Sequence, residues 1–408
     1  MKQGELLRDY LIVTKPTNDH AGNCLWAFAE RNGQEYFVKQ FLDPKRPRPE
    51  SMGSADSKRR LQKVCAEFER RHETVIDRID PSGLDAGNLV TAVDFFCEGT
   101  TYYKVTERVH AVELPPTSTL SALQRKVLLR TLGDSLQLLH GLGIVHGDLK
   151  PTNVLVEARP GPLYIAKVID YDDAYVSGSP PEQGVIGGDV IYGAPEWVRY
   201  NKKADPTVRG TDLTTAADMF ALGLMTHEYL TGARPEHPLI SAGAAVNAGD
   251  ALTLDGRLHE RVAELISALT ARNPASRPTA AHFLEVVGDE SLLELGPGTT
   301  ARRRSRTFAA RPDPRPVGGV DTPGRGGGAA DHGEADGRTD TATGRPTRLR
   351  FGGSTGSAAP GTAAGTDRSA TDTPPASRPA SPAEATSPEP GAPRRSRLRI
   401  HLDNTSSD

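Results

Sequence analysis

The most informative part of this sequence is His146-Gly147-Asp148-Leu149-Lys150-Pro151-Thr152-Asn153, which is followed further along the chain by Asp170-Tyr171-Asp172. Asp148 is a carboxylate that can accept the proton of an attacking hydroxyl, and Lys150 can offset negative charge on a transferred phosphate. Asn153 and Asp170 provide the hard oxygen ligands that Mg²⁺ prefers. The segment therefore predicts a site for phosphoryl transfer, with Mg²⁺, or alternatively Mn²⁺, as its metal.

These two segments resemble the catalytic loop, H-R-D-L-x-x-x-N, and the metal loop, D-F-G, of eukaryotic-type (Hanks-type) serine/threonine protein kinases of bacteria. The resemblance extends over about residues 5–290. It implies an α+β, bilobal protein-kinase-like fold with a small β-rich N-lobe and a helical C-lobe. It also implies ATP as the donor, Ser/Thr hydroxyls of protein substrates as acceptors, Asp148 and Lys150 as catalytic residues, and Asn153 and Asp170 as metal ligands.

The resemblance also assigns a lysine to nucleotide binding. Lys39, in Tyr36-Phe37-Val38-Lys39, is similar to the family's third-strand lysine, which pairs with the α- and β-phosphates. Its partner in the family is a glutamate on a helix, which here would be Glu69 or Glu67. Phe68 belongs to the apolar stripe of that helix, which favours its neighbour Glu69.

Two further segments resemble parts of the adenine and phosphate pocket. Thr106-Glu107-Arg108-Val109 is similar to the hinge between the lobes, where the Glu107 carbonyl and the Val109 amide would meet adenine and Thr106 would flank the pocket. Gly22 is the one glycine where the family has G-x-G-x-x-G. It is a candidate for phosphate binding, and equally an ordinary hairpin residue.

Residues further along are similar to structural parts of the family. Ala194-Pro195-Glu196 matches A-P-E, and Arg277 matches the arginine that forms an ion pair with that glutamate. Asp218 matches a buried aspartate that holds the backbone of the catalytic loop. A buried carboxylate requires hydrogen-bond donors, so backbone amides are its expected partners.

The chain departs from the family at four places. The phosphate loop has a single glycine, and Gly147 replaces the arginine that receives an activation-segment phosphate, which makes the loop non-RD. Asp172 replaces the glycine of D-F-G and is followed by Asp173, so that two extra carboxylates either affect the metal site or face solvent. Asp189 and Phe37 replace a threonine and a small alanine at binding surfaces.

Periodicity around these segments predicts strands followed by helices. We expect one helix over 58–79, with Val64 and Phe68 on its apolar stripe, among the strands of the N-terminal part, and a turn at Asn32-Gly33 before a strand at 35–41. Further strands are expected at 89–96, 101–109, 153–156 and 166–169, and helices at 121–141, 216–231, 257–271 and 279–287. The predicted domains are an N-lobe at 1–110, a C-lobe at 111–296 and a tail at 297–408.

The tail at 297–408 has the composition of a disordered segment. It contains 16 Gly and 14 Pro, with only eight large apolar side chains. So few apolar side chains cannot offset the conformational entropy of such a long segment. Its charge also differs from the rest, at net +5 against −8 for the part of the chain before it.

Composition excludes several classes of protein. The net negative charge of the chain before the tail argues against nucleic acid as a partner. No apolar run is long enough to span a membrane, and residues 1–10 contain no apolar signal region, so a cytoplasmic location is expected. Cys24, Cys65 and Cys97 lack metal or redox spacing, and we expect them to be small buried apolar residues.

Two other functions stay open at this point. His146-Gly147-Asp148 together with Ile169–Ala174 also resembles small-molecule kinases of the aminoglycoside and choline kinase group, although these lack A-P-E and the later arginine. The degenerate glycine loop is compatible with a catalytically weak scaffold. Phe37–Pro44 and the insert at 42–58 resemble a bacterial kinase group found beside a metal-dependent protein phosphatase and a von Willebrand A domain protein, which are candidate partners.

Overall fold

The computed structural model describes residues 1–19, 21–48, 50, 52–79, 88–201, 205 and 207–297. The tail that is predicted to be disordered lies outside the described residues from residue 298 onward. Within the described residues, strands dominate the first part of the chain and helices the second, which confirms the predicted α+β fold. The exact boundary between the lobes, at 110/111, stays a prediction.

A six-stranded antiparallel sheet with the order β1-β2-β3-β4-β6-β5 forms the N-terminal part. Its strands are β1 (Leu6–Leu7), β2 (Tyr10–Ile12), β3 (Cys24–Arg31), β4 (Gln34–Phe41), β5 (Ala92–Glu98) and β6 (Thr101–Glu107). Asn32 and Gly33 connect β3 to β4 with φ angles of 55° and 77°. Two successive positive φ values are typical of a tight hairpin turn, so the predicted turn is confirmed.

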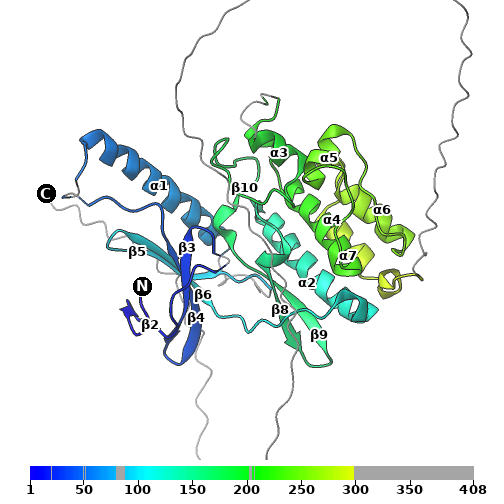
Figure 1. Ribbon diagram of the computed structural model, residues 1–408, viewed down its shortest axis with the longest axis horizontal. Helices are drawn as coiled ribbons and strands as arrows, with labels where there is room; N and C mark the ends of the chain where they lie inside the picture. The colour runs from blue at the N-terminus through cyan, green and yellow to red at the C-terminus, as the bar shows by residue number, and fades with distance from the viewer. Residues whose placement is uncertain are drawn as a thin grey trace, which may run out of the picture. The chain divides into compact units, whose positions relative to one another are not determined.

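Helix α1 (Ala55–Arg78) packs against one end of this sheet, as Figure 1 shows. Ser54 caps its first turn by accepting a hydrogen bond from the Ser57 amide. Cys65 and Ile76 of α1 belong to the same buried cluster as Phe41, Phe95 and Tyr102 of the sheet. The helix therefore covers only part of that sheet face and leaves the rest of it free to line a cavity.

The opposite face of the sheet is a separate core. Because side chains alternate along a strand, Ala27, Val38 and Val105 point to this face while their neighbours point to the other. Leu7, Tyr10 and Ile12 complete the cluster. Buried apolar residues on both sides fix the register of the strands, which places the polar residues described below.

The C-terminal part is built around helix α2 (Ala122–Gly141). Ser121 and Gln124 form a reciprocal capping box at its start. The other elements are β7 (Ile144–Val145), β8 (Val154–Arg159), β9 (Leu163–Val168), β10 (Tyr175–Val176), α3 (Pro195–Asn201), α4 (Ala216–Thr231), α5 (Ala242–Ala248), α6 (Glu260–Leu269) and α7 (Ala280–Val287), with 3₁₀ turns at Thr117–Thr119, Pro151–Asn153, Tyr171–Asp173, Gly210–Asp212, Pro274–Ser276 and Glu290–Leu293. Figure 1 shows α2, α4, α6 and α7 gathered into one helical body, whose core is mostly Leu, Ile and Val.

Some predictions differ from the structure. Val64, predicted on the apolar stripe of α1, is 52% exposed, because the buried face of the helix is the one marked by Cys65 and His72. Leu123 lies in the first turn of α2, before the buried stripe begins, and is 43% exposed. The short helices α3 and α5 are not predicted by periodicity, because a segment of two turns shows too little of it.

No helix among the described residues is long and apolar enough to cross a membrane. The three cysteines are free and buried, as expected. Burial raises the pKa of the Cys24 thiol to about 11, which keeps this group in its neutral form near neutral pH.

Candidate active site

A cavity of about 530 Å³ contains most of the predicted site residues. It is bounded by the sheet, the end of α1, the segment 106–111 and the two loops at 152–153 and 169–171. Six predicted residues line it: Lys39, Thr106, Glu107, Val109, Asn153 and Asp170. Gly22, Glu69, Asp148 and Lys150 are not among the described residues that line the cavity.

Strand register explains the walls of this cavity. Trp26 of β3, Lys39 of β4 and Lys104 of β6 lie side by side across the three strands. Phe28, Phe37 and Thr106 form the next row in the same way. All six therefore project from one face, with an aromatic end, where Trp26 and Phe37 stack at 5.5 Å, and a cationic end.

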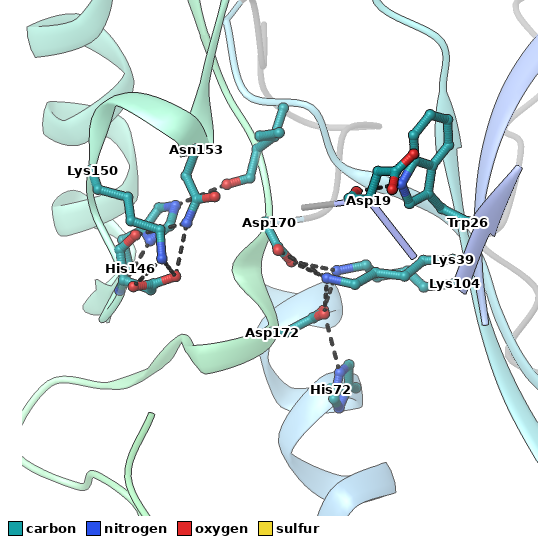
Figure 2. A network of polar contacts seen from close by, with 12 residues as sticks. Asp19, Trp26, Lys39, His72, Lys104, His146, Lys150, Asn153, Asp170 and Asp172 are labelled. Carbon is teal, nitrogen blue, oxygen red and sulfur yellow. Dashed lines mark hydrogen bonds and ion pairs between the residues drawn. The ribbon is translucent and has the colours of Figure 1, made fainter. Parts of the chain in front are cut away.

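The Asp148 carboxylate is held from two sides. Lys150 Nζ lies 2.8 Å from Asp148 Oδ2, and Asn153 Nδ2 donates to Asp148 Oδ2 at 2.9 Å and to the Asp148 carbonyl at 2.8 Å. Burial opposes the charge of Lys150, but the hydrogen bond and the charge of Asp148 outweigh it and hold the Lys150 pKa above its ordinary value. The 3₁₀ turn at Pro151–Asn153 brings the three side chains together, and Figure 2 shows Lys150 and Asn153 at this turn.

Asp218 of α4 fixes the backbone of this loop. Its carboxylate accepts hydrogen bonds from the amides of His146, at 2.8 Å, and Gly147, at 3.1 Å, and contacts His140 Nε2 at 2.9 Å. The His146 ring lies 3.0 Å from the Ile169 carbonyl, just before Asp170. The predicted role of Asp218 is confirmed, and these contacts connect the two loops.

Asp170 adopts a left-handed backbone conformation, with φ of 64°. This conformation is uncommon for residues other than glycine and is frequent where a side chain is held for function. Both carboxylate oxygens of Asp170 contact Lys39 Nζ, at 2.8 and 2.9 Å. The strained backbone thus directs a carboxylate of the C-terminal part toward a lysine of the sheet.

The predicted partner of Lys39 is wrong. Glu69 contacts Arg46 at 2.6 Å and accepts a hydrogen bond from Tyr102, and Glu67 is exposed and paired with Arg70 at 2.5 Å. The helical register causes this difference, because the described residues of α1 that line the cavity are His72, Val75 and Ile76, and the first of these comes about one turn after Glu69.

Carboxylates of the metal loop surround Lys39 instead. Lys39 Nζ lies 2.6 Å from Asp172 Oδ2, and Asp172 also contacts Lys104. Burial would lower the Lys39 pKa, but the charges of Asp172 and Asp170 raise it above its ordinary value. Burial likewise opposes ionisation of Asp172, yet the charges of Lys104 and Lys39 hold its pKa well below the ordinary value.

The segments that are predicted to bind the nucleotide differ in how they contact the cavity. Gly22 has φ of 57° in the turn before β3, with no atom within 4 Å of where a Cβ would lie, and its role in phosphate binding stays a prediction. Asp19 and Ala21 line the cavity beside it, and Trp26 Nε1 donates to the Asp19 carbonyl at 2.9 Å. Arg108, in the hinge segment, lies over the Phe28 ring at 3.9 Å.

The polar end of the cavity fits a nucleotide and its metal. Asn153 and Asp170 offer an amide and a carboxylate, which are hard ligands suited to Mg²⁺. Lys39 and Lys104 offer ammonium groups that match phosphate oxygens. In the described part of the chain, no group of three or more His, Cys, Asp or Glu side chains is arranged to hold a metal ion. Asn153 and Asp170 would be two ligands of a Mg²⁺ ion, which commonly completes its coordination with phosphate oxygens and water.

A second region lies beyond Asp148, on the helical body. Asp189 Oδ2 is 3.6 Å from Lys150 Nζ, and the Asp189 carboxylate accepts hydrogen bonds from the amides of Ile191 and Tyr192. Glu196 and Arg277 form a buried bidentate ion pair, with both N–O distances 2.7 Å. The predicted pair is therefore confirmed, and it connects the segment that carries Asp189 to the helices.

Sequence patterns miss three residues of the site. They do not single out Lys104 or His72, and they leave open whether Asp172 affects the metal site or faces solvent. Alternation in Thr101–Glu107 could have revealed Lys104, since it falls on the same face as Thr106. The structure excludes the solvent-facing alternative for Asp172, which is only 18% exposed.

Comparison with protein families matches residues 70–287 to the protein kinase domain. The matched range includes Asp148, Lys150, Asn153 and Asp170, but begins after Lys39 and Gly22. The match therefore contains the catalytic and metal loops, whereas strands β1 to β4 lie outside it.

Curated proteins give a consistent result. The chain is similar to serine/threonine-protein kinase PknA of Mycobacterium tuberculosis, with 30% identity over 191 residues, which are 44% of this chain and 40% of the relative. It is 26% identical over 185 residues to serine/threonine-protein kinase pkn3 of Myxococcus xanthus, covering 43% and 33% of the two chains. For serine/threonine-protein kinase PkaA of Streptomyces coelicolor the identity is 25% over 242 residues, covering 56% and 42%. The chain thus spans less than half the length of these relatives.

Proposed function

The chain belongs to the protein kinase family, and on this premise we propose that it transfers the γ-phosphoryl group of ATP to Ser/Thr hydroxyls of protein substrates. The observation that carries the proposal is the position of Asp148. Its carboxylate is fixed by Lys150 and Asn153, and Asn153 shares a cavity with Asp170 and Lys39.

Each residue has a distinct task in this proposal. Asp148 orients the acceptor hydroxyl and takes its proton, while Lys150 offsets the negative charge that develops beside it. Asn153 and Asp170 are the metal ligands. When bound, Mg²⁺ supplies positive charge to the phosphate oxygens.

The remaining residues bind the nucleotide. Lys39 pairs with its phosphates, and the aromatic end of the cavity receives its adenine, together with Thr106, which is adjacent to Phe37 on the sheet, and with Glu107 and Val109 of the segment that follows. The apolar rings favour a flat heterocycle there, whereas the lysines favour the anionic end of the same ligand. Gly22, in the turn before β3, remains a candidate for binding the phosphates through its backbone.

A protein acceptor is favoured over a small molecule. The buried Glu196–Arg277 pair holds the segment around Asp189 in a defined conformation next to Asp148 and Lys150. A small-molecule acceptor needs no such platform. A catalytically inactive scaffold is also disfavoured, because the residues needed for phosphoryl transfer lie close together. Asn153 contacts Asp148, and Asp170 contacts Lys39. The phosphatase and von Willebrand A domain protein remain proposed partners.

The function is tested by phosphate transfer from labelled ATP, with Mg²⁺ and then Mn²⁺, to a generic basic protein. We expect transfer that falls at least 10³-fold in Asp148→Asn, because the proton acceptor and the hydroxyl-orienting group are lost together. Asp134→Asn is the matched control, since Asp134 is exposed on α2. Transfer to an aminoglycoside or choline, but not to protein, would contradict the proposal.

We also propose that activity is independent of phosphorylation in the activation segment. Gly147 offers no side chain to receive a phosphate there. Replacing both Ser177 and Ser179 with alanine should leave the initial rate nearly unchanged. The rate is measured on protein made with and without phosphatase co-expression. A decrease of more than tenfold in the double variant would show that this idea is wrong.

A further inference from the structure

Five ionisable side chains meet at the inner end of the cavity, and we call them the inner cluster: Lys39, Lys104, Asp170, Asp172 and His72. Figure 2 shows the two lysines side by side, pointing toward the two aspartates, with His72 of α1 directed toward Asp172. The lysines come from two strands, the aspartates from the metal loop and the histidine from the helix. The cluster therefore joins the sheet, the helix and the metal loop.

The two lysines of the cluster are buried next to each other, and their charges require anionic partners. Lys39 and Lys104 are directly opposite each other on β4 and β6, and their side chains are only 11% and 9% exposed. Like charges at opposed positions destabilise a sheet, and buried charges require counterions. Among the described residues of the sheet, no carboxylate pairs with either lysine, so the anions come from elsewhere.

Asp172 is the carboxylate that serves both lysines. It lies 2.6 Å from Lys39 Nζ through Oδ2 and contacts Lys104 through Oδ1. Asp170 also contacts Lys39 and is 3.6 Å from Lys104, but it is the candidate metal ligand. Only Asp172 can stay with the lysines while Asp170 turns to a metal.

Helix α1, which the structure describes in full, does not provide this charge. Its residue at the cluster is the buried His72, whose Nε2 is 3.6 Å from Asp172 Oδ1. The two glutamates of α1 that were candidates for this role have other partners: Glu69 binds Arg46 and Tyr102, and Glu67 binds Arg70. At the cluster, α1 thus provides a histidine, His72, and the loop after β9 provides the carboxylate of Asp172.

We propose that Asp172 is the residue that positions Lys39 for nucleotide binding, in place of a helical glutamate, and that Lys104 adds a second ammonium group at the phosphate end. The proposal rests on the proposed function. In this proposal the two differences from the family pattern belong together: α1 has a histidine, His72, at the cluster, and the carboxylate that pairs with Lys39 comes from the loop after β9. Asp172 acts through Lys39 and is a positioning residue.

The test compares Asp172→Asn with Glu69→Gln, because both change a largely buried carboxylate to its amide. Binding of an ATP analogue with Mg²⁺ is measured by calorimetry, and kcat and KM by phosphate transfer. We expect Asp172→Asn to weaken binding at least tenfold and to lower kcat at least tenfold. Glu69→Gln should stay within threefold of the unmodified protein in both. Lys104→Met should weaken binding at least fivefold.

A second experiment moves the negative charge from position 172 to position 72 and tests the proposal more directly. The double variant His72→Glu/Asp172→Asn puts a carboxylate on the helix, facing the same lysines. We expect the double variant to recover at least half of the decrease in log affinity and in log kcat that Asp172→Asn causes. A merely structural role for Asp172 predicts no recovery from a charge placed elsewhere.

The outcomes separate this proposal from the proposed function. No phosphate transfer by the unmodified protein would reject the function, while analogue binding would still test Asp172. The inference would be overturned if the analogue affinity and kcat of Asp172→Asn stayed within threefold of the unmodified protein. It would also be overturned if Glu69→Gln lost as much affinity and kcat as Asp172→Asn. If Asp172→Asn does not fold by circular dichroism, Glu69→Gln and Lys104→Met decide: a loss in the first or none in the second rejects the inference.

Discussion

Gly147 stands where the family has an arginine, and its surroundings explain this difference. Its φ is +80°, and a Cβ built there would lie 2.5 Å from the Asp173 carbonyl oxygen and 3.2 Å from Tyr175. Any larger side chain would have to displace the backbone after the metal loop. The close approach of the two loops is thus incompatible with an arginine at this position.

We expect Gly147→Ala to lower the free energy of unfolding by about 1–3 kcal/mol, from the left-handed backbone and the overlap with Asp173. Gly249→Ala is the matched control, because Gly249 has φ of +91° with no atom within 4 Å of its Cβ position. Urea unfolding of both variants measures the difference. Equal losses would mean that the overlap with Asp173 costs nothing.

At the level of single residues, the sequence predicts those that belong to continuous motifs. Asp148, Lys150, Asn153 and Asp170 lie in short segments whose spacing is fixed by the loops themselves. The partner of Lys39 could not be predicted, because it depends on which face of α1 meets the sheet. A shift of one residue turns a helix by about 100°, and α1 carries charges on several faces.

At the level of elements, periodicity predicts the long helices and misses what depends on strand pairing. The predicted bounds of α2 and α4 agree closely with those observed. The pairing of β4 with β6 is not predictable in this way, and it is this pairing that places Lys104 beside Lys39. The start of β3 matches the position of a phosphate loop, although its residues from Cys24 onward form a regular strand with aromatic side chains facing the cavity.

The Glu196–Arg277 pair allows a test of how elements are held together. Both side chains are at most 1% exposed, so removing one charge leaves the other buried and unpaired. We expect Glu196→Gln to lower the free energy of unfolding by about 3–5 kcal/mol. Denaturant unfolding provides the measurement.

Glu67→Gln is the control for this variant, because Glu67 and its partner Arg70 are 61% and 67% exposed. Exposed ion pairs contribute below about 1 kcal/mol. A similarly small loss in Glu196→Gln would show that the buried pair adds little, and that α3 is held by its apolar contacts instead.

At the scale of the whole molecule, the cavity joins parts of the chain that are far apart in sequence. Its walls come from the strands of the N-terminal part and from the loops around Asn153 and Asp170. A ligand that contacts both can bind only when both are folded. The fold class was predictable because the loop motifs imply it, whereas the position of α1 relative to β4 required the structure.

Nucleotide binding should therefore stabilise the described body against heat. An ATP analogue with Mg²⁺ at about 100-fold excess over its Kd adds about 2.7 kcal/mol of stability. We expect a rise in Tm of several degrees, measured by scanning calorimetry. Lys39→Met should lose this rise, whereas Lys126→Met, at a partly exposed lysine of α2 paired with Glu290, should keep it. An equal rise in both variants would contradict a phosphate-binding role for Lys39.

The aromatic end of the cavity also bears on inhibitor design. Phe37 occupies volume that a small alanine leaves free, and it stacks with Trp26. Compounds with broad, rigid ring systems shaped for alanine-bearing enzymes would collide with this ring. A narrow ring that stacks on Phe37, joined to an acidic group that reaches Lys39 and Lys104, would combine fit and charge here. Because alanine offers no stacking surface, such a compound would discriminate against enzymes that carry it.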